Sequence, residues 1–187
     1  MNRKAVVFIG GIGNHPNSIA VLLSNYIHEQ LSLHDIDATI LDSEKMGIPL
    51  LNFSSGGTPK SVEAMAQQMV EADFHIWLTP LYHGSIPGVM KNSLDWLEIT
   101  AKHPKPYLSD KTVGLICWGD GMQSMQGINA MDSIVKALRA WTAPYSVPMV
   151  SGDIFDKEDP KKISEFYAEK INRLVDLVVK TAIERRG

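Results

Sequence analysis

Cysteine is almost absent from this chain: one residue, Cys117, stands among 187. A single thiol excludes an internal disulfide, and it excludes metal and iron–sulfur sites built from four cysteines. Chains without disulfides are typical of reducing compartments, so we expect a cytoplasmic protein. Because Cys117 lies within a β-rich apolar run, we expect it to be a small core residue and not a nucleophile.

Long apolar runs and an excess of one charge are lacking as well. No run approaches the roughly 20 apolar residues of a membrane span, and we expect residues 5–10 to be too few for a signal-peptide core. The formal net charge is −3, without the basic excess that would indicate nucleic acid or an anionic membrane as a partner. The length of 187 residues suggests one domain, residues 1–187, with its own core.

The common catalytic and nucleotide motifs are also missing. There is no G-x-S-x-G nucleophile elbow, no Gly-Lys-Ser/Thr of a P-loop, and no histidine pair with the spacing of a metal site. Gly11 and Gly13 begin like the dinucleotide fingerprint G-x-G-x-x-G, but Pro16 takes the place of the third glycine. We therefore predict no catalytic side chain and no metal ligand. One alternative stays open, a nucleotide-binding protein that uses residues 10–18 and Asp42.

The chain does contain a regular alternation of β-rich runs and amphipathic segments. The expected strands are 4–10, 38–41, 74–79, 112–118 and 147–150. The expected helices are 18–33, 58–72, 87–101, 128–141 and one that starts at Asp159 and Pro160. Residues 46–57 are expected to form a loop. Such alternation implies a parallel sheet with helices on both faces, connected by right-handed crossovers. We predict an α/β, flavodoxin-like fold, a three-layer αβα sandwich whose five-stranded parallel sheet has the order 2-1-3-4-5.

In that order, the loops after the first, third and fourth strands open at one edge of the sheet, where open α/β sheets bind ligands. The first loop, residues 10–18, is rich in glycine, which lets the backbone come close to a ligand. The helix after it presents unpaired N–H groups and the positive end of its dipole. A phosphate suits this loop. The alternative is a tight turn in which Asn17 or Ser18 caps the helix.

The second loop, residues 80–85, is too apolar for an ordinary solvent loop and is constrained by proline and glycine. The backbone N–H groups of Tyr82, His83 and Gly84 can donate to one edge of a heteroaromatic ring, and the loop's apolar side chains can pack on its face. We expect His83 to contribute only its backbone. Ser85 either donates to the ligand from its hydroxyl or caps the following helix.

The third loop, residues 118–123, combines two glycines with several large side chains. Gly119 and Gly121 permit a backbone with positive φ, and Trp118 and Met122 can cover a flat ligand. The alternative is an ordinary turn between a strand and a helix. Together, the three loops predict a site for a flat ligand at the carboxyl edge of the sheet.

The stretch from Pro80 to Trp96 reads PLYHGSIPGVMKNSLDW. It matches the pattern P-x-Y-x-x-S-x-P-G-x-x-K-N-x-L-D-W and so resembles the NADPH-dependent FMN reductase family; the rest of the chain resembles that family more loosely. The resemblance implies a flavodoxin-like fold and an FMN-dependent NAD(P)H oxidoreductase. Such an enzyme takes hydride from NADPH or NADH and reduces a small-molecule acceptor, namely a quinone, an azo compound, a flavin or a metal oxyanion. No acid or base from the protein is needed.

For the cofactor, the resemblance implies contacts at all three loops. The phosphate of FMN would lie on the first loop, at Gly11, Asn14, Asn17 and Ser18. The isoalloxazine ring would lie against the second loop and be flanked by the third, at Pro80, Leu81, Tyr82, His83, Gly84, Ser85, Trp118, Gly119, Asp120 and Gly121.

The resemblance also implies assembly. Family members form dimers or tetramers, so we expect a homodimer or homotetramer, with the helix of Lys91, Asp95 and Trp96 used for assembly. Lys91 and Asp95 are four residues apart, and the alternative is a plain intrahelical ion pair worth only about 0.3–0.5 kcal/mol.

One part of the chain departs from the family pattern. The family's first loop commonly reads G-S-x-R-x-x-S, and here Gly11, Gly13 and Pro16 stand at the positions of its serine, arginine and second serine. A charge-assisted contact contributes about 1.5–3 kcal/mol, so its loss weakens FMN binding by about tenfold to a hundredfold. We therefore expect FMN to be exchangeable, with Lys60 as a candidate replacement for the missing cation.

A second alternative is a flavodoxin-like FMN-binding or electron-transfer module without NAD(P)H turnover. An acidic electron carrier would be expected to have a larger negative charge than the −3 of this chain, which counts against that function.

Overall fold

The computed structural model describes residues 3–54 and 56–184, so Ser55 of the expected loop 46–57 lies outside the described residues. The elements are β1 Arg3–Ile9, α1 Ile19–Leu33, β2 Ile36–Asp42, α2 Lys60–Glu71, β3 Phe74–Pro80, α3 Gly88–Asp95, β4 Thr112–Gly119, α4 Ser124–Ala137, β5 Trp141–Val150 and α5 Glu165–Glu184. Two short 3₁₀ helices follow α3 and β5, at Trp96–Thr100 and Ser151–Asp153. All strand pairs are parallel and the order is β2-β1-β3-β4-β5, which confirms the predicted sheet.

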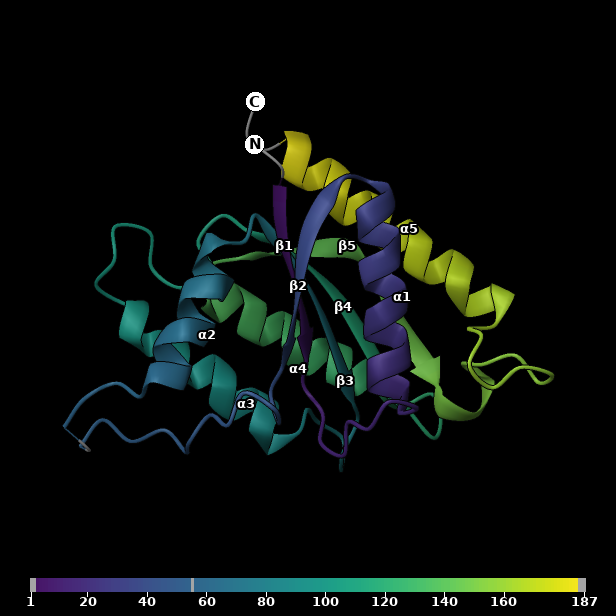
Figure 1. The fold of residues 1–187 in the computed structure, drawn as a ribbon, viewed down its shortest axis with the longest axis horizontal. Coiled ribbons are helices and arrows are strands. Elements are labelled where there is room, and N and C mark those ends of the chain that lie inside the picture. The colour runs from purple at the N-terminus through teal and green to yellow at the C-terminus, as the bar shows by residue number, and fades with distance from the viewer. Residues whose placement is uncertain (1–2, 55, 185–187) are drawn as a thin grey trace.

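Alternate residues of the inner strands face opposite layers. Val7 and Ile9 of β1 pack in the cluster that contains α1 and α5, whereas Val6 and Phe8 pack in the cluster that contains α2, α3 and α4. Figure 1 shows these two groups of helices on opposite sides of the sheet. Every residue of the central strand β3 is buried, which explains its apolar run without polar alternation.

The helices form where apolar residues recur at helical spacing. The helix α1 buries Leu23, Ile27 and Leu31, four residues apart, against the sheet. Its N-terminus is capped by Ser18, whose Oγ accepts a hydrogen bond from the N–H of Val21 over 3.3 Å, which confirms the capping role. Within the described part of the chain, no helix is both long and apolar enough to cross a membrane.

The predicted boundaries of the third and fourth helices are wrong. The helix expected over 87–101 is α-helical only to Asp95 and continues as a 3₁₀ helix to Thr100. The next helix, expected from residue 128, begins at Ser124 and ends at Ala137. Gly127, whose propensity favours a loop, lies inside α4. A Cβ at this position would lie 2.3 Å from Cys117 Sγ, so the close approach of α4 to β4 requires glycine here. Close packing of helix on strand overrides the poor helix propensity of glycine.

The predicted starts of β5 and α5 are wrong as well. The strand β5 begins at Trp141, six residues before the expected 147, and includes Pro144 near a register shift, as an edge strand permits. The last helix begins at Glu165, not at Asp159, because Asp156 Oδ1 accepts the N–H groups of Glu158 (2.8 Å) and Asp159 (3.4 Å). This local bonding makes a turn of the segment that reads as a helix start.

A histidine lies in the middle of the buried strand β3. His75 is fully buried on the same face of β3 as Trp77, and among the described residues neither ring nitrogen has a hydrogen bond of good geometry. Burial, reinforced by the cation of Lys111 and opposed by the backbone of Met69, lowers the pKa of His75 from 6.5 to about 3. Between about pH 3 and pH 6.5, the folded protein therefore holds this imidazole neutral, whereas the unfolded chain would protonate it.

Stability should therefore decrease as the pH falls below 6.5, because the unfolded state then binds a proton that the folded state refuses until about pH 3. The contribution of His75 is about 1.4 kcal/mol per pH unit, or about 2 kcal/mol at pH 5. Urea unfolding at pH 7, 6 and 5 should show a smaller loss for His75→Phe than for wild type. The exposed His103, replaced as His103→Gln, is the control and should keep the wild-type dependence; equal slopes for all three proteins would contradict the assignment.

Candidate functional site

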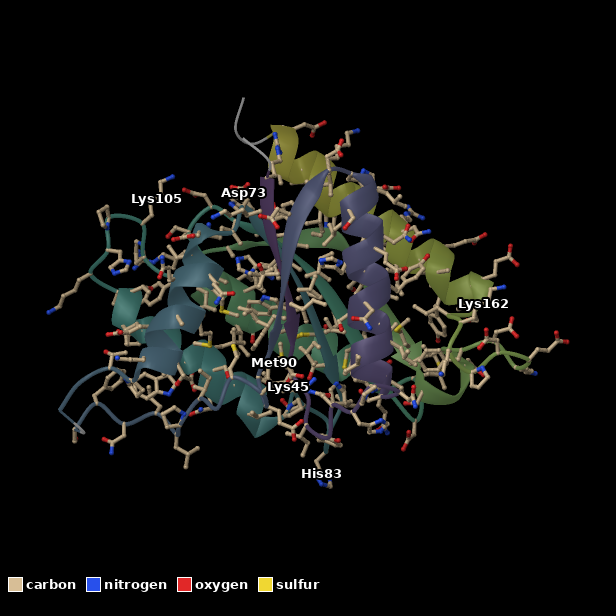
Figure 2. All side chains as sticks on the ribbon, viewed as in Figure 1. Lys45, Asp73, His83, Met90, Lys105 and Lys162 are labelled. Carbon is tan, nitrogen blue, oxygen red and sulfur yellow. The ribbon has the colours of Figure 1, made fainter. Side chains whose placement is uncertain are left out.

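The carboxyl ends of β1, β3 and β4 meet at one edge of the sheet. The N–H of Gly10 donates to the carbonyl of Leu78 (2.8 Å), and the N–H of Leu81 donates to the carbonyl of Trp118 (2.7 Å). These bonds join the first loop to β3 and the second loop to β4. Figure 2 shows Lys45, Met90 and His83 toward this end of the molecule, with Asp73 and Lys105 toward the other. The predicted convergence of the three loops is therefore present.

The second loop is a tight turn. The backbone groups of Tyr82 and Ser85 bond to each other in both directions, over 2.9 and 3.0 Å, and His83 and Gly84 have positive φ values of 49° and 83°. This conformation is that of a type I′ hairpin turn. The N–H of Tyr82 is thus already used, contrary to expectation, whereas those of His83 and Gly84 have no acceptor among the described residues.

Ser85 does not cap the following helix. Pro87 occupies the N-cap position of α3, and no side chain caps this N-terminus. Both backbone groups of Ser85 face Tyr82 across the turn, so its position depends on that hairpin and not on α3. The capping alternative for Ser85 is wrong.

A cleft of about 670 Å³ lies between the second and third loops. Its walls are Leu81, His83, Gly84, Gly119, Asp120, Gly121, Met122 and Gln123. Six of the ten residues expected at the isoalloxazine ring line this cleft. Pro80 and Trp118 are paired neighbours in β3 and β4 and are buried, while Tyr82 and Ser85 are exposed outside the walls of the cleft. Trp118 is a core residue that packs in the cluster containing α1 and α5.

Because Gly127 has no side chain, the helix α4 can pack closely against Cys117 of β4 and against Leu81, a wall of this cleft. A Cβ at this position would lie 2.3 Å from Cys117 Sγ and 3.3 Å from Leu81 Cδ1. Cys117 is buried, and its burial raises the pKa of the thiol to about 12. The thiol is therefore a packing group, as expected, and not a nucleophile.

The first loop is held by two carboxylates. The N–H groups of Gly13 and Asn14 donate to the two carboxylate oxygens of Glu44, each over 3.0 Å. The buried side-chain amide of Asn14 donates to Asp42 Oδ1 (2.9 Å) and to the carbonyl of Gly11 (3.3 Å). The backbone N–H groups of Asn14 and Gly13, with the cation of Lys45, keep the pKa of Glu44 below its ordinary value, although partial desolvation of the carboxylate opposes them.

Asp42 acts as an anchor inside the protein. Besides Asn14, its Oδ1 accepts the N–H groups of Glu44 (3.1 Å) and Lys45 (3.4 Å). Its Oδ2 lies 3.2 Å from Lys45 Nζ, as an ion pair without the alignment of a hydrogen bond. Asp42 is thus engaged, which argues against the alternative in which it binds a ribose. The cation beside the loop is Lys45, while Lys60 begins α2 and forms no ion pair with the described residues.

The second half of the family signature supports the neighbouring loops. Met90 packs under the first loop, where a Cβ on Gly10 would meet its Sδ at 2.3 Å. Asn92 Nδ2 and Trp96 Nε1 both donate to the carbonyl of Pro49, over 2.9 and 2.7 Å. Trp96 is also 5.8 Å from the ring of Phe53, edge to face. The sequence did not indicate this bracing role, since the partners lie 43 and 47 positions apart in the chain.

Another hollow, of about 580 Å³, lies at the opposite edge of the sheet, among Asp73, Lys105 and Tyr107. Its charged groups include Lys105, which lies 3.6 Å from Asp110, and Glu71, which lies 3.3 Å from Lys4. A groove of exposed, mutually paired charges at the amino ends of parallel strands is not where this fold binds ligands. The carboxyl-edge cleft is therefore the candidate site.

A model of the NADPH-dependent FMN reductase family matches residues 4–153. The chain belongs to this family. It is 32% identical over 163 residues to the FMN-dependent NADPH-azoreductase of Staphylococcus aureus, covering 83% of this chain and 81% of the relative. Family membership confirms the resemblance, and with it an oxidoreductase that depends on FMN and NADPH.

Solved structures with low sequence identity share the fold. The flavoenzyme NAD(P)H:(acceptor) oxidoreductase FerB of Paracoccus denitrificans superposes with a TM-score of 0.78 at 16% identity, over 98% of each chain. A short-chain flavodoxin superposes with a TM-score of 0.62 at 19% identity, over 97% of this chain and 99% of its own. Because reductases and a flavodoxin share the fold, the family match and not the fold favours the reductase over the carrier alternative.

The residues present fit FMN unequally at its two ends. The cleft between the second and third loops has the size and the free N–H donors for a flavin ring. At the first loop, the N–H groups of Gly13 and Asn14 are already bonded to Glu44. The ring end fits, while the phosphate end would require Glu44 to move.

The substitution Gly127→Ala should lower the free energy of unfolding by about 1–3 kcal/mol, because the new methyl group overpacks the contact with Cys117. Urea unfolding measures this loss. Gly88→Ala is the matched control, since this helical glycine has open space around it and should be near neutral. Combining Gly127→Ala with Cys117→Ala should recover part of the loss; an equal effect of the single changes at 127 and 88 would contradict the packing argument.

Proposed function

We propose that residues 1–187 act as a single FMN-binding domain that reduces azo compounds and related small acceptors with NADPH. The observation that supports this most directly is the cleft at the carboxyl edge, bounded by two loops and supplied with unpaired backbone donors. Bound FMN would supply the hydride chemistry, accepting hydride from NADPH or NADH and passing it to an azo compound, quinone, flavin or metal oxyanion. The 32% identity to an NADPH-azoreductase favours azo compounds as the first acceptors to test.

The protein's own contribution would be to bind and orient the ring. The N–H groups of His83 and Gly84 would donate to its polar edge, where negative charge develops on reduction. Leu81 would pack against the ring, while Gly119 and Gly121 let the third loop approach it without side chains. Among the cleft residues only His83 and Asp120 ionise, and hydride exchange requires neither as an acid or base. We therefore assign no catalytic side chain.

The phosphate would lie at the first loop, near Gly11, Asn14, Asn17 and Ser18. Asn17 is exposed, and its side chain forms no hydrogen bond with the described residues. Ser18 is the N-cap of α1, whose first N–H groups and dipole favour an anion. Gly11 would contribute through the shape of the loop, and Asn14 through its backbone N–H, because the Asn14 side-chain amide already holds Asp42 and the Gly11 carbonyl.

The purified protein should bind FMN and show a flavin absorption band. NADPH added under anaerobic conditions should bleach that band, because the family depends on NADPH, and an azo dye or quinone should restore it. NADH is tested beside NADPH, and a screen of acceptors ranks the substrates. Absence of FMN binding would contradict the proposal, and binding without bleaching would favour the electron-carrier alternative.

The substitution Gly84→Ala should weaken FMN binding about tenfold, because alanine disfavours the turn's left-handed backbone by about 1–2 kcal/mol. The added Cβ would also lie 2.9 Å from Gln126 Oε1 of α4. Gly56→Ala carries the same backbone penalty, at φ 79° with nothing nearby, and is the control. Titration of flavin fluorescence measures both; equal affinities of the two variants for FMN would place the ring elsewhere.

We also propose that the protein is a cytoplasmic homodimer or homotetramer, with a second copy and small molecules as partners and no nucleic acid. The exposed apolar side chains Leu50 (82% exposed) and Phe53 (62%) support assembly, because the loop that carries them is held in place by Asn92 and Trp96. Such rigid apolar groups are typical of interfaces. The single buried thiol Cys117 and the net charge of −3 are compatible with this location and choice of partners.

Light scattering coupled to size-exclusion chromatography should show an oligomer. The change Leu50→Glu should shift it toward the monomer, because a charge at an apolar interface is desolvated without a partner. Leu33→Glu changes a leucine of similar exposure (77%) at the C-terminal end of α1 and is the control. A monomeric wild type, or identical masses for both variants, would contradict the proposed interface.

A further inference from the structure

The first loop already holds an anion of its own. Glu44 follows β2 and reaches the first loop, where its two carboxylate oxygens accept the N–H groups of Gly13 and Asn14 at 3.0 Å each. This arrangement is bidentate, with one oxygen for each donor. A phosphate group bound to the same backbone groups would present the same pair of acceptors in the same place.

Two of the other polar side chains of the first loop are already hydrogen-bonded. The Asn14 amide is engaged by Asp42 and by the Gly11 carbonyl, and the Ser18 hydroxyl accepts the N–H of Val21. The family's arginine is absent, because Gly13 stands at its position. Besides the Asn17 side chain and the first N–H groups of α1, the N–H groups that Glu44 occupies are therefore the backbone donors by which the tip of this loop would bind a phosphate.

The carboxylates around the loop also disfavour the binding of a phosphate. Asp42 and Glu44 place two carboxylates beside it, and Lys45 is the cation nearby, lying 3.2 Å from Asp42. A phosphate that enters while Glu44 stays in place meets like charge at close range. A phosphate that takes the two N–H groups must first break both hydrogen bonds of Glu44.

We propose that Glu44 is an internal competitor for the phosphate-binding N–H groups of the first loop and thereby sets how strongly the protein prefers FMN to riboflavin. The proposal rests on the placement of the flavin phosphate at this loop. Riboflavin has the same ring and ribityl chain without the phosphate, so its binding does not require Glu44 to leave. Competition by Glu44 would make FMN exchangeable even though the ring cleft is intact.

The test compares the two flavins on the apoprotein. Fluorescence titrations with FMN and with riboflavin give both affinities for wild type, Glu44→Gln and Glu44→Ala. We expect both substitutions to tighten FMN binding by about tenfold, since two charge-assisted hydrogen bonds no longer compete, while riboflavin binding stays unchanged. Glu63→Gln, an exposed acidic residue in the first turn of α2, removes the same charge away from the loop and should alter neither affinity.

Each other outcome has a definite meaning. If Glu44→Gln and Glu44→Ala leave FMN affinity unchanged or weaken it, Glu44 only shapes the loop and the inference is overturned. If FMN and riboflavin gain equally, the effect does not act through the phosphate and the inference is again overturned. If neither flavin binds wild type or variants, the proposed function itself fails. This result differs from the first two because riboflavin, which has no phosphate, also fails to bind, so the ring contacts are absent as well.

Discussion

The parallel pairing of β1, β3 and β4 is the constraint on which the rest of this structure depends. Because the three strands run in the same direction, with Ile9 beside Leu78 and Pro80 beside Trp118, their carboxyl ends lie at one edge. The buried central strand β3 is shared by both pairings and is covered by helices on both faces. The position of each ligand loop therefore follows from the burial of an apolar strand and not from contacts among the loops themselves.

Backbone N–H groups explain why the two ends of the site differ. A buried or partly buried donor must find an acceptor in the ligand-free protein. The first loop meets this requirement internally, through Glu44, whereas the tip of the second loop leaves the donors of His83 and Gly84 open to the cleft. The loop that is well satisfied alone has less to gain from a ligand, so the ring end and the phosphate end contribute unequally to flavin affinity.

The family signature performs two physical tasks in one continuous segment. Its first part forms the hairpin turn at His83 and Gly84, the wall of the cleft. Its second part lies on α3 and braces neighbouring loops, with Met90 beneath Gly10 and Trp96 bonded to Pro49. The exposed ion pair of Lys91 and Asp95, at 2.6 Å, adds little to stability. The length of the pattern thus reflects two tasks, since its first part faces the ligand cleft and its second part packs against the scaffold.

The sequence by itself determined the strand order, the flavodoxin-like class, the three converging loops and the family, because apolar periodicity and a long local motif carry that information. Only the tertiary structure decided where α4 begins, since Gly127 is helical for the sake of a contact with Cys117. It alone decided that Trp118 is buried in the core and that Glu44 bonds to a loop 30 residues earlier. These features depend on strand register and close packing between distant segments, which local spacing does not encode.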